Sequence, residues 1–252
     1  MNIMDLNGMQ SKCEKPHAKL MLGDCIDKLN DVNSNSIDAI IADIPYNINY
    51  DTWDNFNLCD VIDALNRTLK SNGNLIIFAG YSNVTEVKQI LETKFTLQDW
   101  IIWDRIKGRG AKRHLVSTRE DILWFTKSDN YTFNKISSNI LKVTQGFGQT
   151  NGNEYRSLSN VWTDISPIVP WSKEKVNHPT QKPIQLMERC VKIWTNPHDT
   201  ILDFTMGSGS TGIAALNLNR NFIGIERNLQ YFQLAVSRFM QKQLFWKIDV
   251  IQ

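Results

Sequence analysis

The sequence predicts an α/β protein with a doubly wound, mostly parallel sheet and an antiparallel hairpin at one edge of that sheet. Short apolar runs that suit buried strands alternate with amphipathic runs that suit helices along most of the chain. Two strand-like runs, 95–103 and 122–126, have no apolar helix between them, which favours a hairpin. The chain has 252 residues, enough for one such domain with a modest insertion.

Composition narrows the class of protein. Hydrophobic residues make up 42% of the chain and the formal net charge is +2, so a nucleic-acid partner would need a local basic surface. The four cysteines are scattered, which argues against a zinc site or a disulfide framework. No apolar run has the roughly 18 residues of a membrane span, and the first residues do not fit a secretory signal. We expect a cytoplasmic protein with no metal and no membrane contact, a loose tail at 1–17 and a single domain at 18–252.

The first elements lead to a candidate active-site loop. A short strand at 19–22 precedes Asp24, which suits the cap of a helix over 25–32. The apolar run 37–42 reads as a buried parallel strand, so the residues after it would lie at the edge where open α/β sheets bind ligands. Those residues are Asp43, Ile44, Pro45 and Tyr46.

A mobile active-site loop is predicted at 47–54. The next predicted elements are a helix from Val61 to about Asn72-Gly73, a strand over 75–79, a helix over 84–91 and the two hairpin strands.

The hairpin connection is strongly basic. Between Asp104 and Arg119 it has six cations and one acid. The cations are Arg105, Lys107, Arg109, Lys112, Arg113 and Arg119. A solvated hairpin tip is the simpler interpretation, but a position beside the predicted crevice suits contacts with nucleic-acid phosphates.

The stretch 128–176 is rich in Asn, Ser, Gly and Gln and has weak periodicity. We interpret it as an inserted substrate-reading segment, with a disordered surface loop as the alternative.

The second half contains a glycine-rich turn. Pro183 suits the first turn of a helix that carries Leu186, Met187, Cys190, Val191 and Trp194. The predicted elements after it are a strand at 200–202, a helix at 213–218, a strand at 222–225 and a helix at 229–240. Gly207, Gly209 and Gly212 fit G-x-G-x-x-G between the first strand and the following helix, and Glu226 ends the second strand. Alone, these features also fit a nicotinamide dinucleotide fold or a purely structural turn.

Two stretches resemble the amino-group DNA methyltransferases. Asp43 to Tyr46 is similar to their Asp-Pro-Pro-Tyr catalytic loop, and 203–210 resembles their S-adenosylmethionine loop. The catalytic loop comes first, as in the permuted β subgroup, and the resemblance runs from Gly23 to about Arg238. It implies a Rossmann-like methyltransferase fold, S-adenosylmethionine as cofactor, and site-specific methylation of double-stranded DNA with residues 128–176 as the target-recognition segment. The expected target is the exocyclic N6 amine of an adenine flipped out of the duplex, because Asp at position 43 resembles the adenine-specific members.

The resemblance also implies roles for individual residues. The Asp43 carboxylate and the Ile44 carbonyl would accept hydrogens from the target amine, and Tyr46 would stack on the base. Glu226 would accept hydrogen bonds from both ribose hydroxyls of the cofactor. The full set of expected cofactor-binding residues is Asp24, Cys25, Thr180, Lys182, Asp203, Phe204, Gly207, Gly209, Ser210, Thr211 and Glu226.

Within that set, Asp24 would pair with the adenine amino group, and Thr180 and Lys182 would meet the cofactor's carboxylate. Asp203 would hold the methionine end of the cofactor, together with the backbone amides near Gly207.

Several alternatives stay open from the sequence. Ile44 replaces the family's first proline, and Phe204-Thr205 replaces its Pro-Phe. An N4-cytosine methyltransferase is the main alternative, followed by a nicotinamide-dependent oxidoreductase and by a catalytically silent DNA-binding relative. A homodimer and a partner restriction enzyme are also open. Candidate wedges for base flipping are Trp53, Trp162 and Trp171, although anchoring within the fold suits each of them.

Overall fold

The computed structural model describes residues 15–46, 56–106, 113, 115–141, 155–242 and 244–252. The strands are β1 (His17–Leu22), β2 (Ile37–Asp43), β3 (Leu69–Ala79), β4 (Thr96–Asp104), β5 (Arg119–Thr126), β6 (Ser137–Leu141), β7 (Tyr155–Ser157), β8 (Val161–Trp162), β9 (Thr200–Asp203), β10 (Asn221–Glu226) and β11 (Lys247–Ile251). The α-helices are α1 (Cys25–Lys28), α2 (Ile62–Thr68), α3 (Val84–Leu91), α4 (Ile184–Trp194), α5 (Ser210–Asn217) and α6 (Leu229–Met240). Short 3₁₀ helices cover Leu29–Asp31 and Leu58–Asp60.

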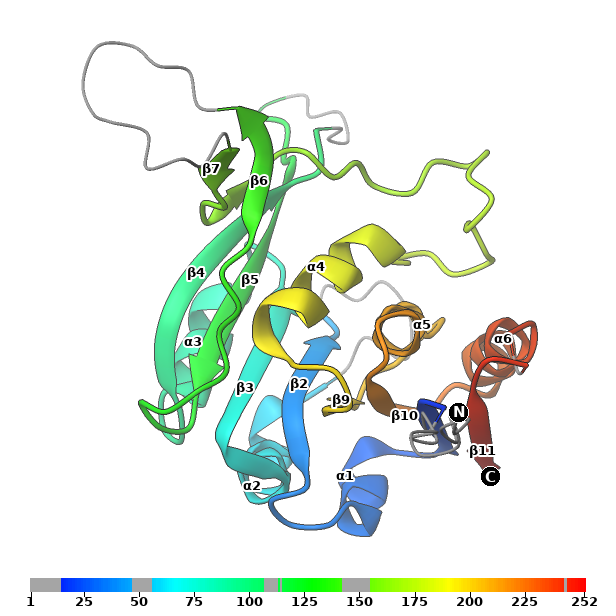
Figure 1. The fold of residues 1–252 in the computed structure, drawn as a ribbon. Helices are drawn as coiled ribbons and strands as arrows, with labels where there is room; N and C mark the ends of the chain where they lie inside the picture. The colour runs from blue at the N-terminus through cyan, green and yellow to red at the C-terminus, as the bar shows by residue number, and fades with distance from the viewer. Residues whose placement is uncertain (1–14, 47–55, 107–112, 114, 142–154, 243) are drawn as a thin grey trace, which may run out of the picture.

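One sheet organises the described part of the chain (Figure 1). Its strand order is β11-β1-β10-β9-β2-β3-β5-β4-β8, and β6 pairs with β7 separately. All pairings in the large sheet are parallel except those of β5, which is antiparallel to β3 and to β4. This confirms the predicted doubly wound, mostly parallel fold and its antiparallel hairpin, although β8 adds one more strand at the edge.

The sheet has a topological switch point between β2 and β9. These strands lie side by side in parallel, with Ala39 opposite Ile201 and Ile40 opposite Leu202. From β2 the sheet continues to β3 on one side, and from β9 it continues to β10 on the other. Open α/β sheets bind ligands outside the carboxyl ends of strands at such a point. Two loops far apart in the sequence therefore leave the sheet next to each other.

Helices cover both faces of the sheet, as Figure 1 shows. Along β2 and β3 the side chains alternate between two cores, as the period of a strand requires. Ile41 and Phe78 pack in the core that includes residues of α4, α5 and α6. Ile40 and Ile77 pack in the core on the other face, with residues of α2 and α3.

Several elements differ from those predicted. The predicted helix from Val61 ends at Thr68, and residues 69–73 already belong to β3, with Leu69 opposite Ile37. Strand pairing outweighs the turn preference of Asn72-Gly73 there. The strands β6, β7 and β11 were not predicted, and β1 begins at His17, inside the predicted tail. No helix in the described ranges is long and apolar enough to span a membrane.

Candidate functional site

A cavity of about 340 Å³ opens at the carboxyl ends of β2 and β9. Asp43 ends β2 and Asp203 ends β9, so the strand pairing alone brings these two acids to the same edge. All the predicted catalytic and cofactor-binding residues line this cavity except Gly209. The sequence motifs before and after the 128–176 segment therefore form one site.

The glycine-rich turn gives the cavity its floor. Gly207 and Gly209 have φ values of 53° and 79°, in the left-handed region that favours glycine. A Cβ at position 207 would lie 2.9 Å from Nε2 of His178, so a larger residue would also collide there. The Gly207 amide donates to Oε2 of Glu226 at 2.8 Å, and the Asn228 amide donates to Oε1 at 2.7 Å. These bonds fix the turn on the end of β10 and direct the N-terminus of α5 at the cavity.

Buried acids give this part of the cavity its electrostatic character. Asp203 is 2% exposed, and burial raises the pKa of its carboxyl to about 7. Burial also raises the pKa of Glu226. The Asp24 carboxylate caps α1 by accepting from the Ile26 amide at 2.9 Å. Burial raises the pKa of the Cys25 thiol to about 12, so this side chain stays a neutral thiol. The first amides of a helix have no partner within the helix, and such amides beside carboxylates suit a ligand with hydroxyl groups and a zwitterionic end.

The catalytic loop is held from two sides. The Tyr46 hydroxyl donates to Oδ1 of Asp43 at 3.1 Å, and the Lys182 ammonium donates to Oδ2 at 2.5 Å. The Thr205 hydroxyl donates to the main-chain oxygen of Asp43 at 3.1 Å. Ile44 is 3% exposed and belongs to the core beneath the loop, so its side chain fills space where the family has a proline. The loop is thus a rigid platform for a carboxylate.

Lys182 lies at the end of the cavity that contains Asp43. Its ammonium is 2.5 Å from Asp43 and 3.2 Å from Oε2 of Glu120. The predicted contact of Lys182 with a cofactor carboxylate stays a prediction. Thr180 lines the same cavity and is exposed.

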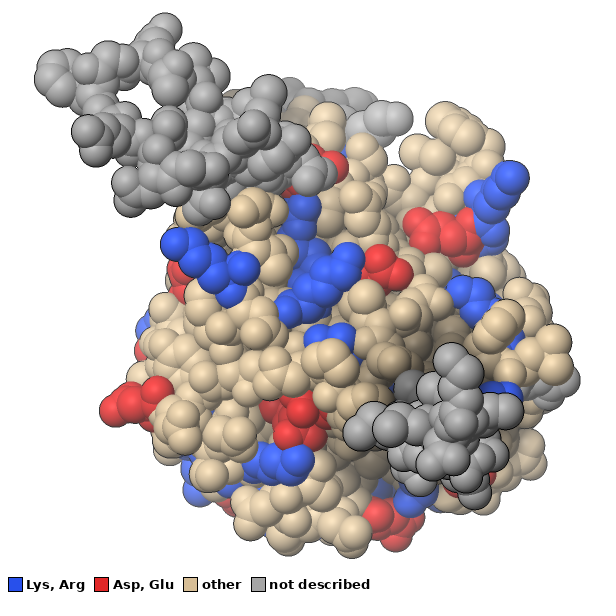
Figure 2. All heavy atoms as spheres, viewed as in Figure 1, with Lys and Arg blue, Asp and Glu red and all other residues tan. Residues whose placement is uncertain are grey.

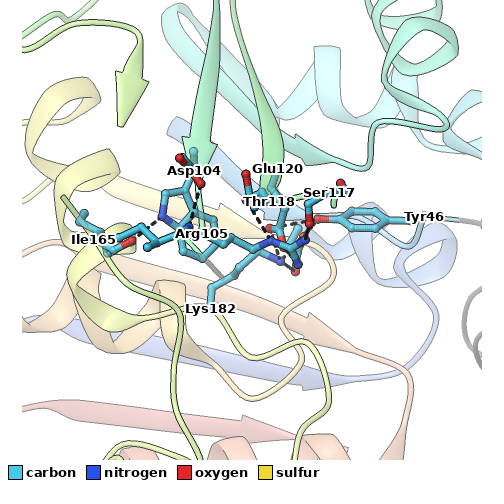
Figure 3. Close-up of polar contacts among 11 residues, drawn as sticks. Tyr46, Asp104, Arg105, Ser117, Thr118, Glu120, Ile165 and Lys182 are labelled. Carbon is cyan, nitrogen blue, oxygen red and sulfur yellow. Dashed lines mark hydrogen bonds and ion pairs between the residues drawn. The ribbon is translucent and has the colours of Figure 1, made fainter. Parts of the chain in front are cut away.

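Two residues that hydrogen-bond to the Asp43 loop, Glu120 and Thr205, were not predicted as site residues from the sequence. Glu120 lies near the start of β5 (Figure 3), and β5 runs antiparallel to β3. The first residues of an antiparallel strand lie at the edge where its parallel neighbours end, so Glu120 faces Asp43. The alternation of side chains along a strand could have shown which face Glu120 lies on. Residues two apart share a face, and Ile122 and Trp124 lie on the face that α4 covers. Thr205 stands at one of the departures from the family pattern.

The basic hairpin loop is only partly described. The Arg105 guanidinium pairs with Oε1 of Glu120 at 3.2 Å and donates to the carbonyls of Ser117 and Thr118 (Figure 3). Arg119 pairs with the buried Asp121 at 3.1 Å, and Arg113 is exposed. Lys107, Arg109 and Lys112 lie outside the described residues. Figure 2 shows acidic and basic side chains mixed over the face in view, which fits the small net charge.

The three candidate tryptophans have different environments, and the start of the 128–176 segment packs against the sheet. Trp162 is 2% exposed and anchors the fold, Trp171 is 79% exposed, and Trp53 lies outside the described residues. The start of the segment is tied to the sheet by Asn74, whose amide donates to the Thr132 carbonyl at 2.8 Å. That part of the segment is therefore ordered against the core.

Comparison with known proteins agrees with the geometry of the site. A family model described as DNA methylase matches residues 37–237. The type II methyltransferase M1.MboII of Moraxella bovis is 34% identical over 251 residues, covering 87% of this chain and 95% of that protein. The DNA adenine methyltransferase YhdJ of Escherichia coli (strain K12) is 34% identical over 258 residues, covering 91% of this chain and 87% of that protein. The crystal structure of the M1.HpyAVI-SAM complex superposes with a TM-score of 0.65 at 33% identity, covering 88% of this chain and 99% of that one.

Proposed function

The chain belongs to the DNA methylase family and is an S-adenosylmethionine-dependent DNA methyltransferase, and we propose that it methylates the N6 amine of adenine in double-stranded DNA. The observation that carries this proposal is the single cavity lined both by Asp43 and by the glycine-rich turn. Such a cavity lets an acceptor for the target amine face the site of the methyl donor. The name of one relative at 34% identity, the DNA adenine methyltransferase YhdJ, supports adenine as the base.

The proposed role of the catalytic loop follows from the chemistry of an exocyclic amine. Its lone pair is delocalised into the ring, so the amine is a weak nucleophile. A carboxylate and a carbonyl that accept its two hydrogens return electron density to the nitrogen as it attacks the methyl group. Asp43 and the Ile44 carbonyl would supply these acceptors, fixed in place before charge develops. Tyr46 would present its ring to a base that has left the duplex.

The residues of the cavity fit S-adenosylmethionine. When bound, this cofactor supplies an electrophilic methyl group on a sulfonium. Glu226 would accept from the ribose hydroxyls, because its carboxylate closes the cavity at the end of β10. Asp203 would face the cationic methionine end, and the amides at the start of α5 would face its carboxylate. The φ of 53° at Gly207 and the collision that a Cβ would make there support a turn built for close approach of a ligand.

We propose that residues 128–176 recognise the target sequence and that the basic loop, where Arg113 is exposed, contacts the DNA backbone. A homodimer and a cytoplasmic location stay predictions from the sequence.

Sequencing of genomic DNA from cells that express the protein tests this function, with detection of modified bases. The expected result is N6-methyladenine at one short recognition sequence, absent in cells that express Asp43→Ala. Methylation of cytosine instead would overturn the choice of base, and unmodified DNA would overturn the activity.

A further inference from the structure

In the structure the catalytic carboxylate is already engaged. One oxygen of Asp43 accepts from the Tyr46 hydroxyl and the other pairs with the Lys182 ammonium at 2.5 Å. A cation this close neutralises the charge with which Asp43 would polarise the target amine. Lys182 must therefore draw back from Asp43 for the carboxylate to act as a strong acceptor.

When Lys182 moves away from Asp43, its buried ammonium needs another negatively charged partner. Its side chain is 6% exposed, and a buried ammonium without a counter-ion is strongly destabilising. Burial alone would lower the pKa of Lys182, but Asp43 and Glu120 together raise it, so the group stays charged. A second carboxylate close to Lys182 would act as its counter-ion after the ammonium leaves Asp43.

Glu120 is placed to be that second carboxylate. Its side chain is 12% exposed, and its two oxygens have different neighbours (Figure 3). Oε1 pairs with Arg105 at 3.2 Å, and this ion pair holds the carboxylate in place. Oε2 faces both Lys182, at 3.2 Å, and the Tyr46 hydroxyl, at 3.4 Å. Both groups that occupy Asp43 therefore have Glu120 as their alternative partner.

We propose that Glu120 is a positioning residue that receives Lys182, and with it the Tyr46 hydroxyl, when the target amine binds to Asp43. Arg105 keeps Glu120 in place for this exchange. The inference rests on the proposed methylation of an exocyclic amine, and it adds a role for the β4–β5 hairpin, which thereby holds part of the active site. No covalent bond is made or broken at Glu120; the exchange changes only the ionic and hydrogen-bonding partners of Lys182 and of the Tyr46 hydroxyl.

The first test compares Glu120→Gln with wild type in single-turnover methyl transfer. The variant keeps the size of the side chain but leaves Lys182 with Asp43 as its only carboxylate partner in this cluster. The rate of methyl transfer should fall about tenfold or more, the effect of disturbing a hydrogen bond to a charged group. The KM for the cofactor and the melting temperature should stay close to wild type. Glu92→Gln on the surface of α3 is the matched control and should change neither rate nor KM.

The pH profile separates positioning from a loss of structure. The charged and titratable groups around Asp43 are Lys182, Glu120, Tyr46 and Asp203. Burial raises the pKa of Asp43, Lys182 lowers it and Glu120 raises it. Removing the charge of Glu120 should therefore move the acidic limb of the rate profile to lower pH. A variant that is only partly folded would have a lower rate at every pH, with the acidic limb of the profile at the same pH as in wild type.

A double-mutant cycle asks whether Glu120 acts through Lys182. In the Lys182→Met background the loss caused by Glu120→Gln should shrink or disappear, because there is no cation to receive. Equal losses in both backgrounds would overturn the proposal, as would an unchanged rate in Glu120→Gln. If Lys182→Met has no measurable rate, the rate of Glu120→Gln alone decides: a fall of about tenfold or more supports the proposal and an unchanged rate overturns it. Failure of the proposed function looks different, because wild type would then methylate no adenine.

Discussion

At the scale of single residues, function depends on a few side chains whose environment changes their chemistry. Asp203 and Lys182 are buried and Asp43 is partly buried, and burial together with neighbouring groups shifts the pKa of each. Shifts of this kind concentrate at functional sites.

Replacement of Asp43 by Asn should separate catalysis from binding. The amide keeps the shape of the side chain but loses the negative charge that we propose polarises the target amine. The rate of methyl transfer should fall at least about a hundredfold, as on loss of a preorganised electrostatic group. Cofactor affinity, measured by calorimetry, should stay within a few-fold of wild type. A variant with near-normal turnover would exclude Asp43 as the acceptor.

Asp203 should make cofactor binding depend on pH. The pKa of its carboxyl is raised from 3.8 to about 7 by burial, and the cationic end of the cofactor favours the ionised form. Affinity should therefore rise with pH up to about 7 and then level off, with release of a proton on binding. Calorimetry in buffers of different ionisation enthalpy measures that proton. Asp203→Asn should abolish this part of the pH dependence; if the variant keeps the same profile, another group is responsible.

The same pKa has a consequence for the free energy of unfolding without cofactor. The folded protein holds the Asp203 proton up to about pH 7, whereas the unfolded chain releases it near 3.8. Stability from this group is therefore greatest below pH 3.8 and is lost as the pH rises towards 7. Cofactor binding then offsets the loss, since it favours the charged carboxylate.

At the scale of elements, the site depends on how loops from neighbouring strands support one another. The Asp43 loop and the glycine-rich turn were predictable, because each follows an apolar strand and carries residues with a known steric purpose. Glu120 was not, because its place depends on the antiparallel pairing of β5 with β3. Local patterns contain no information on such long-range pairing. For the same reason Asn72-Gly73 suggested a helix end although β3 continues through it.

Thr205 should couple the two loops. Its hydroxyl donates to the main-chain oxygen of Asp43 at 3.1 Å, so it joins the turn after β9 to the end of β2. Thr205→Val keeps the shape but removes the donor, and kcat should fall about two- to tenfold, the effect of one hydrogen bond. Thr205→Ser retains the hydroxyl and should retain most of the rate. Equal rates in the two variants would mean that this hydrogen bond has no part in placing Asp43.

At the scale of the whole molecule, the doubly wound sheet explains why motifs far apart in the sequence form one cavity. The doubly wound architecture and most of the elements were predictable from hydrophobic periodicity, but β6, β7, β8 and β11 were not. The path of residues 128–176 was not, because that stretch has weak periodicity and is ordered in part by single contacts such as those of Asn74. Charge at this scale is balanced, so attraction to DNA must be local.

The salt dependence of DNA binding tests where that local attraction lies. Arg113 is exposed in the basic loop, so Arg113→Gln should weaken binding to all sequences alike. The slope of log K against log salt should fall by about one. Lys94→Gln, beyond the end of α3, is the control and should leave the slope unchanged. An unchanged slope for Arg113→Gln would place the phosphate contacts elsewhere.

The central claim is that Asp43 and the glycine-rich turn form one active site for methylation of the adenine amine. Mass spectrometry of nucleosides tests it directly, on DNA incubated with purified protein and isotope-labelled S-adenosylmethionine. The labelled methyl group should appear in N6-methyladenine with wild type and be absent with Asp43→Asn. Label in N4-methylcytosine alone, or in no base at all, would contradict the account.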